Sequence, residues 1–148
     1  MNVLVAELGY DFSYESYVAP DSDSVNIHSV RVFVGETLSL TQETGINASV
    51  EALLNVNKET NAINASDGTK GVSPFKDTRF NGKVALTTNL WKSLAFGFSF
   101  GFKYDQNPAP RPMPANAKDA SWPAEYWSLA YAQRWDTATE ATLLYTFF

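Results

Sequence analysis

The stretch that decides the fold is SLAFGFSFGFKYD, residues 93–105. Its even positions carry only bulky apolar or aromatic side chains: Leu94, Phe96, Phe98, Phe100, Phe102 and Tyr104. Its odd positions carry serine, alanine and glycine until Lys103 and Asp105. Unbroken alternation over this stretch predicts a β-strand with two chemically different faces. An aromatic row opposite a nearly bare face is typical of a narrow barrel whose aromatic side meets lipid.

Length and composition narrow the class of protein. At 148 residues the chain fits one domain, because two domains would each have a marginal core. A net charge of −5 argues against a nucleic-acid partner, since phosphate binding requires a basic patch. The absence of cysteine excludes a disulfide framework and a cysteine-ligated zinc site. We expect no metal and no other cofactor.

Membrane helices are not predicted. The sequence has no run of eighteen apolar residues. Membrane barrel strands alternate, and their mean hydropathy is therefore unremarkable, like the value of −0.21 here. Neither a basic region nor an apolar run follows Met1, so we expect an exported form to have lost its leader.

Other segments repeat the two-faced pattern and are also predicted to be strands: 2–17, 26–41, 44–57, 78–91 and, over a shorter span, 140–148. Segment 26–41 fits least well, because Phe33 falls on its polar face and Glu36 on its apolar face. Glycine within a strand often marks a bulge, so a bulge near Gly35 is predicted.

The connections between these segments predict the topology. Short connections, at 42–43 and 92, fall at one end with both termini, and long ones, 18–25, 58–77 and 106–137, fall at the other. Outer-membrane barrels have this arrangement of short periplasmic turns and long external loops. Segment 121–135 is compatible with a strand or with a helix starting at Pro123, and an even strand count favours an external loop.

We therefore predict an all-β fold, an antiparallel up-and-down transmembrane β-barrel with about six strands in this chain. Single-chain barrels begin at eight strands, so six do not close comfortably. We expect further strands on the N-terminal side, with self-association or an open sheet as alternatives. A terminal aromatic after alternating apolar residues is what such barrels present to the barrel assembly machinery, here as Leu143, Tyr145, Phe147 and Phe148.

The last seventy or so residues carry several short motifs: Asp77-Thr78-Arg79, Trp91-Lys92-Ser93-Leu94, Tyr104-Asp105-Gln106-Asn107-Pro108, Asp136-Thr137 and Leu144-Tyr145-Thr146-Phe147-Phe148. In these motifs the chain resembles the salt-stress-induced outer-membrane proteins, a domain family of unknown function. The resemblance implies a barrel in the outer membrane of a Gram-negative bacterium, in contact with its lipid, and brings no catalytic residues. Members tend to be longer, so the chain is expected to correspond to the C-terminal half of the barrel.

Charged side chains of both signs fall on the predicted polar faces: Glu7, Asp11, Glu15, Arg31, Glu51, Arg79, Lys83 and Lys103. Inside a barrel we expect them to form a charge network, because unpaired buried charges are costly. A salt-bridged plug is favoured over a selective pore or an ion site. Gly97, Ser99 and Gly101 leave room for the longer charged side chains.

Three further sets of residues were considered as sites. His28, the only histidine, falls with the valines and away from polar-face serines, which argues against a Ser–His hydrolase. Asp21, Asp23 and Asp67 lack the EF-hand spacing and are expected to be solvated. Aromatics near strand ends or in loops fit an interfacial girdle, with core packing as the competing interpretation: Tyr14, Tyr17, Trp91, Tyr104, Trp122, Trp127 and Trp135.

These observations favour an outer-membrane β-barrel protein that is structural or weakly channel-forming and has no catalytic activity. The alternative is a soluble lipocalin-like barrel that binds an apolar ligand with the aromatic row inside. This alternative is less favoured, because the outward face of such a barrel would consist of glycine and serine rather than the charged residues that protect soluble strands.

Overall fold

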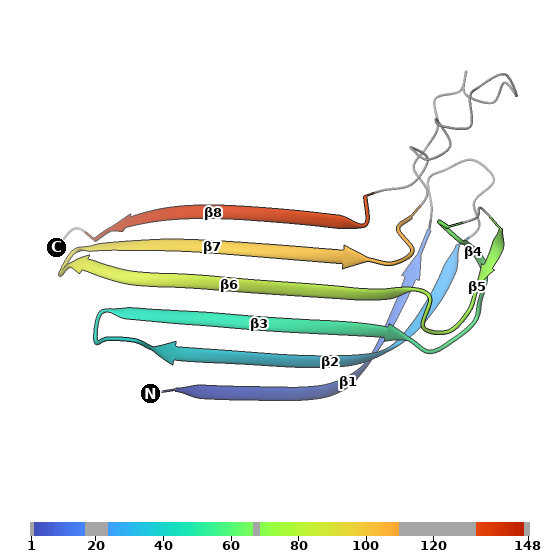
Figure 1. Ribbon diagram of the computed structural model, residues 1–148, viewed down its shortest axis with the longest axis horizontal. Coiled ribbons are helices and arrows are strands. Elements are labelled where there is room, and N and C mark those ends of the chain that lie inside the picture. Colours follow the sequence, from blue (N-terminus) through green and yellow to red (C-terminus); the bar gives the residue numbers. More distant parts are fainter. Residues whose placement is uncertain (1, 17–23, 67–68, 110–132, 147–148) are drawn as a thin grey trace, which may run out of the picture.

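The computed structural model describes residues 2–16, 24–66, 69–109 and 133–146. Six long strands form one antiparallel sheet in the order β1-β2-β3-β6-β7-β8, and two short strands form a separate hairpin (Figure 1). The long strands are β1 (Val3–Glu15), β2 (Val25–Ser39), β3 (Thr44–Asn55), β6 (Thr78–Trp91), β7 (Leu94–Asp105) and β8 (Trp135–Tyr145). The hairpin strands are β4 (Glu59–Ile63) and β5 (Lys70–Val72). No described helix is long and apolar enough to cross a membrane.

The prediction of an all-β chain with six long antiparallel strands is confirmed. Each long strand pairs with its neighbours in the sheet in a register that is continuous except for one shift between Asn89 and Trp91 of β6, next to the turn into β7. The alternating faces of the strands therefore join into two faces of the sheet. On β7, for example, Phe98 lies between Leu86 of β6 and Ala141 of β8. We call the face with the aromatic row of β7 the apolar face and the opposite one the polar face.

The sheet is open among the described residues. β1 pairs only with β2, and β8 pairs only with β7. The short turns, the start of β1 and the end of β8 lie at one end of the sheet, and the strand ends that lead into the long connections lie at the other (Figure 1). We call these the turn end and the loop end.

Three predictions about individual segments are wrong. There is no bulge near Gly35, because the register of β2 with β1 and with β3 runs through it without a shift. The last strand begins at Trp135 rather than at residue 140. The connection 58–77 is not a plain loop, since it contains β4 and β5. Of segment 121–135, residues 121–132 lie outside the described residues.

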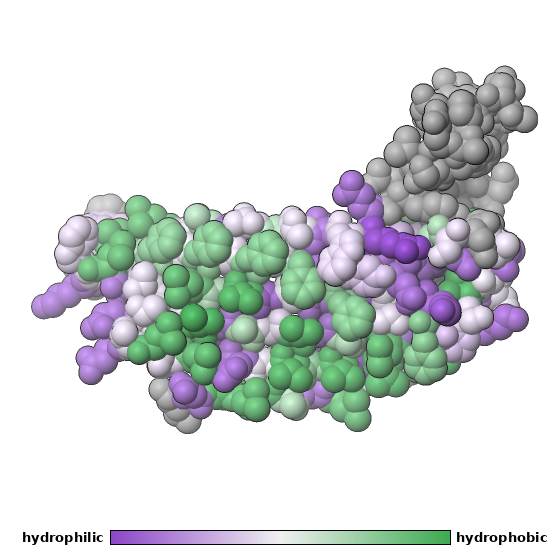
Figure 2. Space-filling view, viewed as in Figure 1, coloured by the Kyte–Doolittle hydropathy of each residue, from purple (hydrophilic) through white to green (hydrophobic). Residues whose placement is uncertain are grey.

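The apolar face is exposed over most of its length. Leu8, Tyr10, Val84, Phe98 and Leu143 are each at least 43% exposed. Figure 2 shows hydrophobic side chains gathered over the long strands, with hydrophilic ones at the ends. The described buried apolar residues instead form one small cluster at the loop end, made of Val25, Ile27, Ala62 and Val72. Val25 and Ile27 belong to the polar face, since they pair with Glu15 and Ser13.

The loop ends of β1 and β2 bend over the polar face. Arg79 of β6 shares a cross-strand row with Gly9 of β1, and Glu15 lies six positions beyond that glycine. β1 and β6 are three strand spacings apart, roughly 14 Å in a flat sheet. Arg79 and Glu15 nevertheless make an ion pair of 2.5 Å. The polar face is therefore the concave one at this end, and Figure 1 shows the same bend in β1 and β2.

Candidate functional site

A first charge cluster crosses the middle of the polar face. Arg31 of β2 donates to Glu7 of β1 at 2.9 Å and to Glu51 of β3 at 2.5 Å. Asn81 of β6 donates a second hydrogen bond to Glu51 at 2.9 Å. These four side chains lie on one face because the antiparallel register aligns their strands. The cluster links four neighbouring strands through side chains.

Phe33 on the polar face belongs to this cluster. The Arg31 guanidinium carbon lies 5.3 Å from the centre of the Phe33 ring, within the range of a cation–π contact. A Cβ added at Gly35 would meet the same ring at 3.0 Å. Glycine at this position therefore makes room for the Phe33 ring on the polar face without a bulge. Glu36 lies on the apolar face, opposite Leu4 and Ala48, and has no structural explanation.

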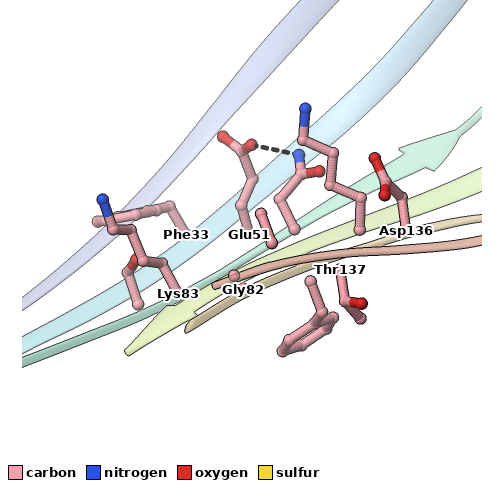
Figure 3. A pocket seen from close by; sticks show the side chains of 12 residues that line it. Phe33, Glu51, Gly82, Lys83, Asp136 and Thr137 are labelled. Atoms are coloured by element: carbon pink, nitrogen blue, oxygen red, sulfur yellow. Dashed lines mark hydrogen bonds between the residues drawn. The ribbon is translucent and has the colours of Figure 1, made fainter. Parts of the chain in front are cut away.

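A groove lies beside the first cluster, with a cavity of about 300 Å³. Figure 3 shows Phe33, Glu51, Lys83 and Asp136 on one side of the strands and Thr137 on the other. Gly101 also lines the groove. Lys83 and Lys103 both line it and form no ion pair with any residue that the structure describes.

A second charge cluster lies at the loop end and is centred on Arg79. Its guanidinium makes the pair with Glu15 described above, and its Nε lies 3.5 Å from Asp105 and 3.6 Å from Asp77. Asp105 is the cross-strand partner of Arg79, whereas Glu15 and Asp77 are brought in by the bend of β1 and by the chain before β6. One cation thus faces three carboxylates.

A fourth carboxylate joins them from the hairpin. Glu59 at the start of β4 is 3% exposed and accepts a hydrogen bond from Asn55, which is 0% exposed. Burial and the nearby charge of Asp77 raise the pKa of Glu59 to about 8. Burial also raises the pKa of Asp77, which is 2% exposed, to about 6. At neutral pH the Glu59 carboxyl is mostly protonated.

The β4–β5 hairpin is tied to the loop end by polar contacts as well as by its apolar cluster. The Asn107 carboxamide accepts from the Ala65 amide at 2.7 Å and donates to the Ile63 carbonyl at 3.2 Å. The Phe75 amide donates to the Asn55 carbonyl at 2.9 Å. Asn107 lies two residues after the end of β7 and is only 6% exposed, and Asn55 at the end of β3 also donates to Glu59 of the hairpin. The hairpin is therefore fastened both to β3 and to the chain after β7.

Five of the eight predicted charged residues make ion pairs, in two separate clusters: Glu7, Arg31 and Glu51 in one, Glu15 and Arg79 in the other. The remaining three, Asp11, Lys83 and Lys103, form no ion pair within the described part of the chain. Sequence reasoning missed Asn55, Glu59, Asp77 and Asp105 as members of the second cluster. Asp77 and Asp105 are part of two of the motifs named above. No motif or alternating pattern in the neighbouring sequence indicates that Glu59 belongs to the cluster.

His28 lies on the apolar face, as its position in the alternation predicts. Its ring contacts the Tyr10 hydroxyl through Nδ1 and lies 5.1 Å from the Phe12 ring. Ser29 and Ser13 point to the other face of the sheet. Within the part of the chain that the structure describes, no serine of the polar face therefore lies beside His28.

The remaining predicted residues are placed as follows. Tyr104 and Trp135 pack together at the loop end with ring centres 4.7 Å apart, Tyr14 lies near the loop end of β1, and Trp91 lies at the turn end of β6. The other named residues fall outside the described part of the chain: Tyr17, Asp21, Asp23, Asp67, Trp122, Trp127, Phe147 and Phe148. No group of three or more described His, Asp or Glu side chains is arranged to hold a metal ion.

Comparisons with protein-family models, with curated proteins and with solved structures found no match to this chain.

Proposed function

We propose that this chain is an outer-membrane β-barrel protein, structural or weakly channel-forming and without catalytic activity. The observation that carries the proposal is the contrast between the two faces of one sheet. The face with the aromatic rows is exposed, while the opposite face is concave at the loop end and carries the ion pairs. Lipid is the solvent that stabilises such an exposed apolar face.

Strand length supports a membrane location. The long strands have 11 to 15 residues. At roughly 3.3 Å per residue they are longer than the ~25 Å apolar band of an outer membrane, even when tilted. The aromatic pair Tyr104–Trp135 at the loop end and Trp91 at the turn end fit the two interfacial girdles.

The interior favours a structural role over an open pore. The two charge clusters cross the polar face, and the hairpin fills part of its loop end. Paired charges in a confined interior hold strands together and leave little free charge to select ions. The groove lined by Lys83 and Lys103 is the remaining space that supports weak conduction.

Closure of the barrel requires more strands than the six in this sheet. Because six is even, β1 and β8 run in opposite directions, so an even number of added strands keeps every pairing antiparallel. The edge strands carry acids on their polar faces that form no ion pair with the described residues, Asp11 on β1 and Asp136 and Glu140 on β8. We therefore expect the closing strands to present lysine or arginine to the interior.

Extraction and gel mobility test the proposal. The protein is expected to require detergent for solubility and, once folded in it, to migrate differently on a gel before and after boiling. A variant in which Phe98 and Phe100 are both replaced by lysine is the control, since charges on the lipid face oppose folding in the membrane. A freely soluble monomer in buffer without detergent would contradict the proposal and favour the lipocalin-like alternative.

A further inference from the structure

The β4–β5 hairpin rests on a buried pair of acids. Glu59 begins β4 and Asp77 immediately precedes β6, and both are at most 3% exposed. Above them, Ala62 and Val72 of the hairpin pack on Val25 and Ile27 of β2. The polar face at the loop end is thus covered by a small element whose docking surface includes two carboxyl groups.

The surrounding groups supply too little positive charge for all these acids. The charged groups that face the pair are Glu15 from β1, Arg79 from β6 and Asp105 from β7, so four carboxyls share one guanidinium. Asn55 from β3 is neutral and contacts Glu59 through its amide nitrogen. Asp77 shares Arg79 with Glu15 and Asp105, so a second buried anion at Glu59 would be costly, and a proton on one carboxyl removes that cost.

The hydrogen bonding of these groups also favours a bound proton. The described residues offer no donor to three buried oxygen atoms at this place, Asn55 Oδ1, Glu59 Oε2 and Asp77 Oδ1. An ionised carboxylate only accepts hydrogen bonds, whereas a protonated one also donates. Arg79 Nε is a buried donor 3.6 Å from Asp77 Oδ1, and it too has no hydrogen-bond partner among the described residues. A proton on the Glu59–Asp77 pair therefore adds a donor among oxygen atoms that the neighbouring donors leave unsatisfied.

We propose that the Glu59–Asp77 pair is a proton-binding site that latches the β4–β5 hairpin onto the loop end of the sheet. With the proton bound, the hairpin stays docked; when the proton leaves, two buried anions repel each other and the hairpin opens. The latch depends on the described contacts alone. Only its consequence, a barrel mouth that opens in alkaline surroundings, rests on the proposed function.

The sign of the pH effect follows from linkage. An acid with a higher pKa in the folded state binds more protons when folded, so stability falls as the pH rises between its two pKa values. For Glu59 that window runs from the ordinary value of 4.5 to about 8. For Asp77 it runs from 3.8 to about 6. The hairpin is therefore expected to be docked in mild acid and to loosen through neutral to alkaline pH.

Amide hydrogen exchange tests the latch in the full-length protein, in detergent or in buffer as its solubility dictates. The reporters are the amides of Ala65, bonded to Asn107, and of Asn64, bonded to Thr69. After correction for the intrinsic exchange rate, we expect their protection to fall roughly tenfold or more between pH 6 and pH 9. Amides at the centre of β7 should keep their protection over the same range.

Two variants separate the latch from a general pH effect. Glu59→Gln keeps the shape without the charge, so the protection of the hairpin amides should become independent of pH. Asp77→Asn removes the neighbouring charge that helps raise the Glu59 pKa, so the loss of protection should move to lower pH. Glu43→Gln in the exposed turn between β2 and β3 should behave as the wild type.

A flat wild-type profile between pH 6 and pH 9 would overturn the latch, as would an unchanged pH dependence in Glu59→Gln. If Glu59→Gln does not fold, Asp77→Asn is the deciding variant. A pH dependence of amide protection in Asp77→Asn that is the same as in the wild type would then contradict the proposal. Neither result bears on the barrel itself. Failure of the barrel proposal would appear as detergent-independent solubility with the same exchange profile.

Discussion

Gly82 of β6 lies beneath an aromatic ring of the neighbouring strand. A Cβ at this position would overlap the ring of Phe102, so the ring would have to turn away from Gly82. The Trp135 ring lies beside it, with ring centres 6.3 Å apart. We expect Gly82→Ala to lower the free energy of unfolding by about 1–2 kcal/mol through overpacking. Gly97→Ala is the matched control, since its Cβ would meet Thr142 at an ordinary 3.8 Å.

Urea unfolding in detergent, followed by tryptophan fluorescence, measures both glycine variants. Gly97→Ala should change the stability by less than about 0.5 kcal/mol. Equal losses of unfolding free energy in the two variants would show that the contact between Gly82 and Phe102 does not determine the effect of Gly82→Ala.

Arg79 holds the second charge cluster together. Arg79→Met leaves Glu15, Asp77 and Asp105 without their shared cation. We expect a loss of about 2–3 kcal/mol, below the upper range for a fully buried pair because only Asp77 is fully buried. The deficit should shrink in acid, because protonation neutralises the remaining carboxylates. Lys83→Met, on the same strand and face, removes a cation that has no described ion pair and should cost much less. A similar loss in both variants at pH 7 would contradict this assignment.

At the scale of the element, β7 tests which face meets lipid. Phe98 and Ser99 are neighbours on opposite faces near the middle of the strand. In lipid vesicles we expect Phe98→Arg to cost about 2–4 kcal/mol, because arginine at the bilayer midplane is unfavourable. Ser99→Arg should lower the free energy of unfolding by less than about 1 kcal/mol, because Ser99 lies on the polar face, in a groove that Thr87 and Glu140 also line. Guanidinium titrations of the two variants give the comparison, and the reverse order would place the aromatic row inside.

The strands differ in how far their sequences predict them. β6 and β7 are predicted almost to the residue, because neighbouring positions contrast in size or polarity throughout β7 and over most of β6, apart from Thr87–Thr88. The first half of β8 is missed, since Thr137, Ala138 and Thr139 alternate without such a contrast. β4 and β5 are missed because they are short and their place depends on distant contacts, such as those of Asn107 with Ile63 and Ala65.

The candidate site shows the same limit. Alternation puts Glu7, Arg31 and Glu51 on one face, so their proximity is predictable once the strands are recognised. Their pairing also needs the register, which short-range patterns do not contain. The association of Glu59 with Asp77 depends on the connection between β3 and β6 folding back over the sheet. The alternation of side chains along the sequence does not indicate where a connection folds.

The whole molecule is organised by the separation of its two faces. The described buried apolar residues of the polar face lie at the loop end. On the apolar face, large side chains such as Leu8 and Leu143 are at least 66% exposed. This is the inverse of a water-soluble sheet, which covers its apolar face with a second layer. The central claim is therefore that lipid covers the apolar face.

Spin-label scanning of β7 tests that claim most directly. The chain has no cysteine, so single-cysteine variants at positions 95 to 103 each carry one label without further changes. In lipid vesicles we predict that labels at even positions are accessible to oxygen and those at odd positions to a water-soluble nickel complex, with a period of two. Labels at even positions that are shielded from lipid, or that report only water, would contradict the account.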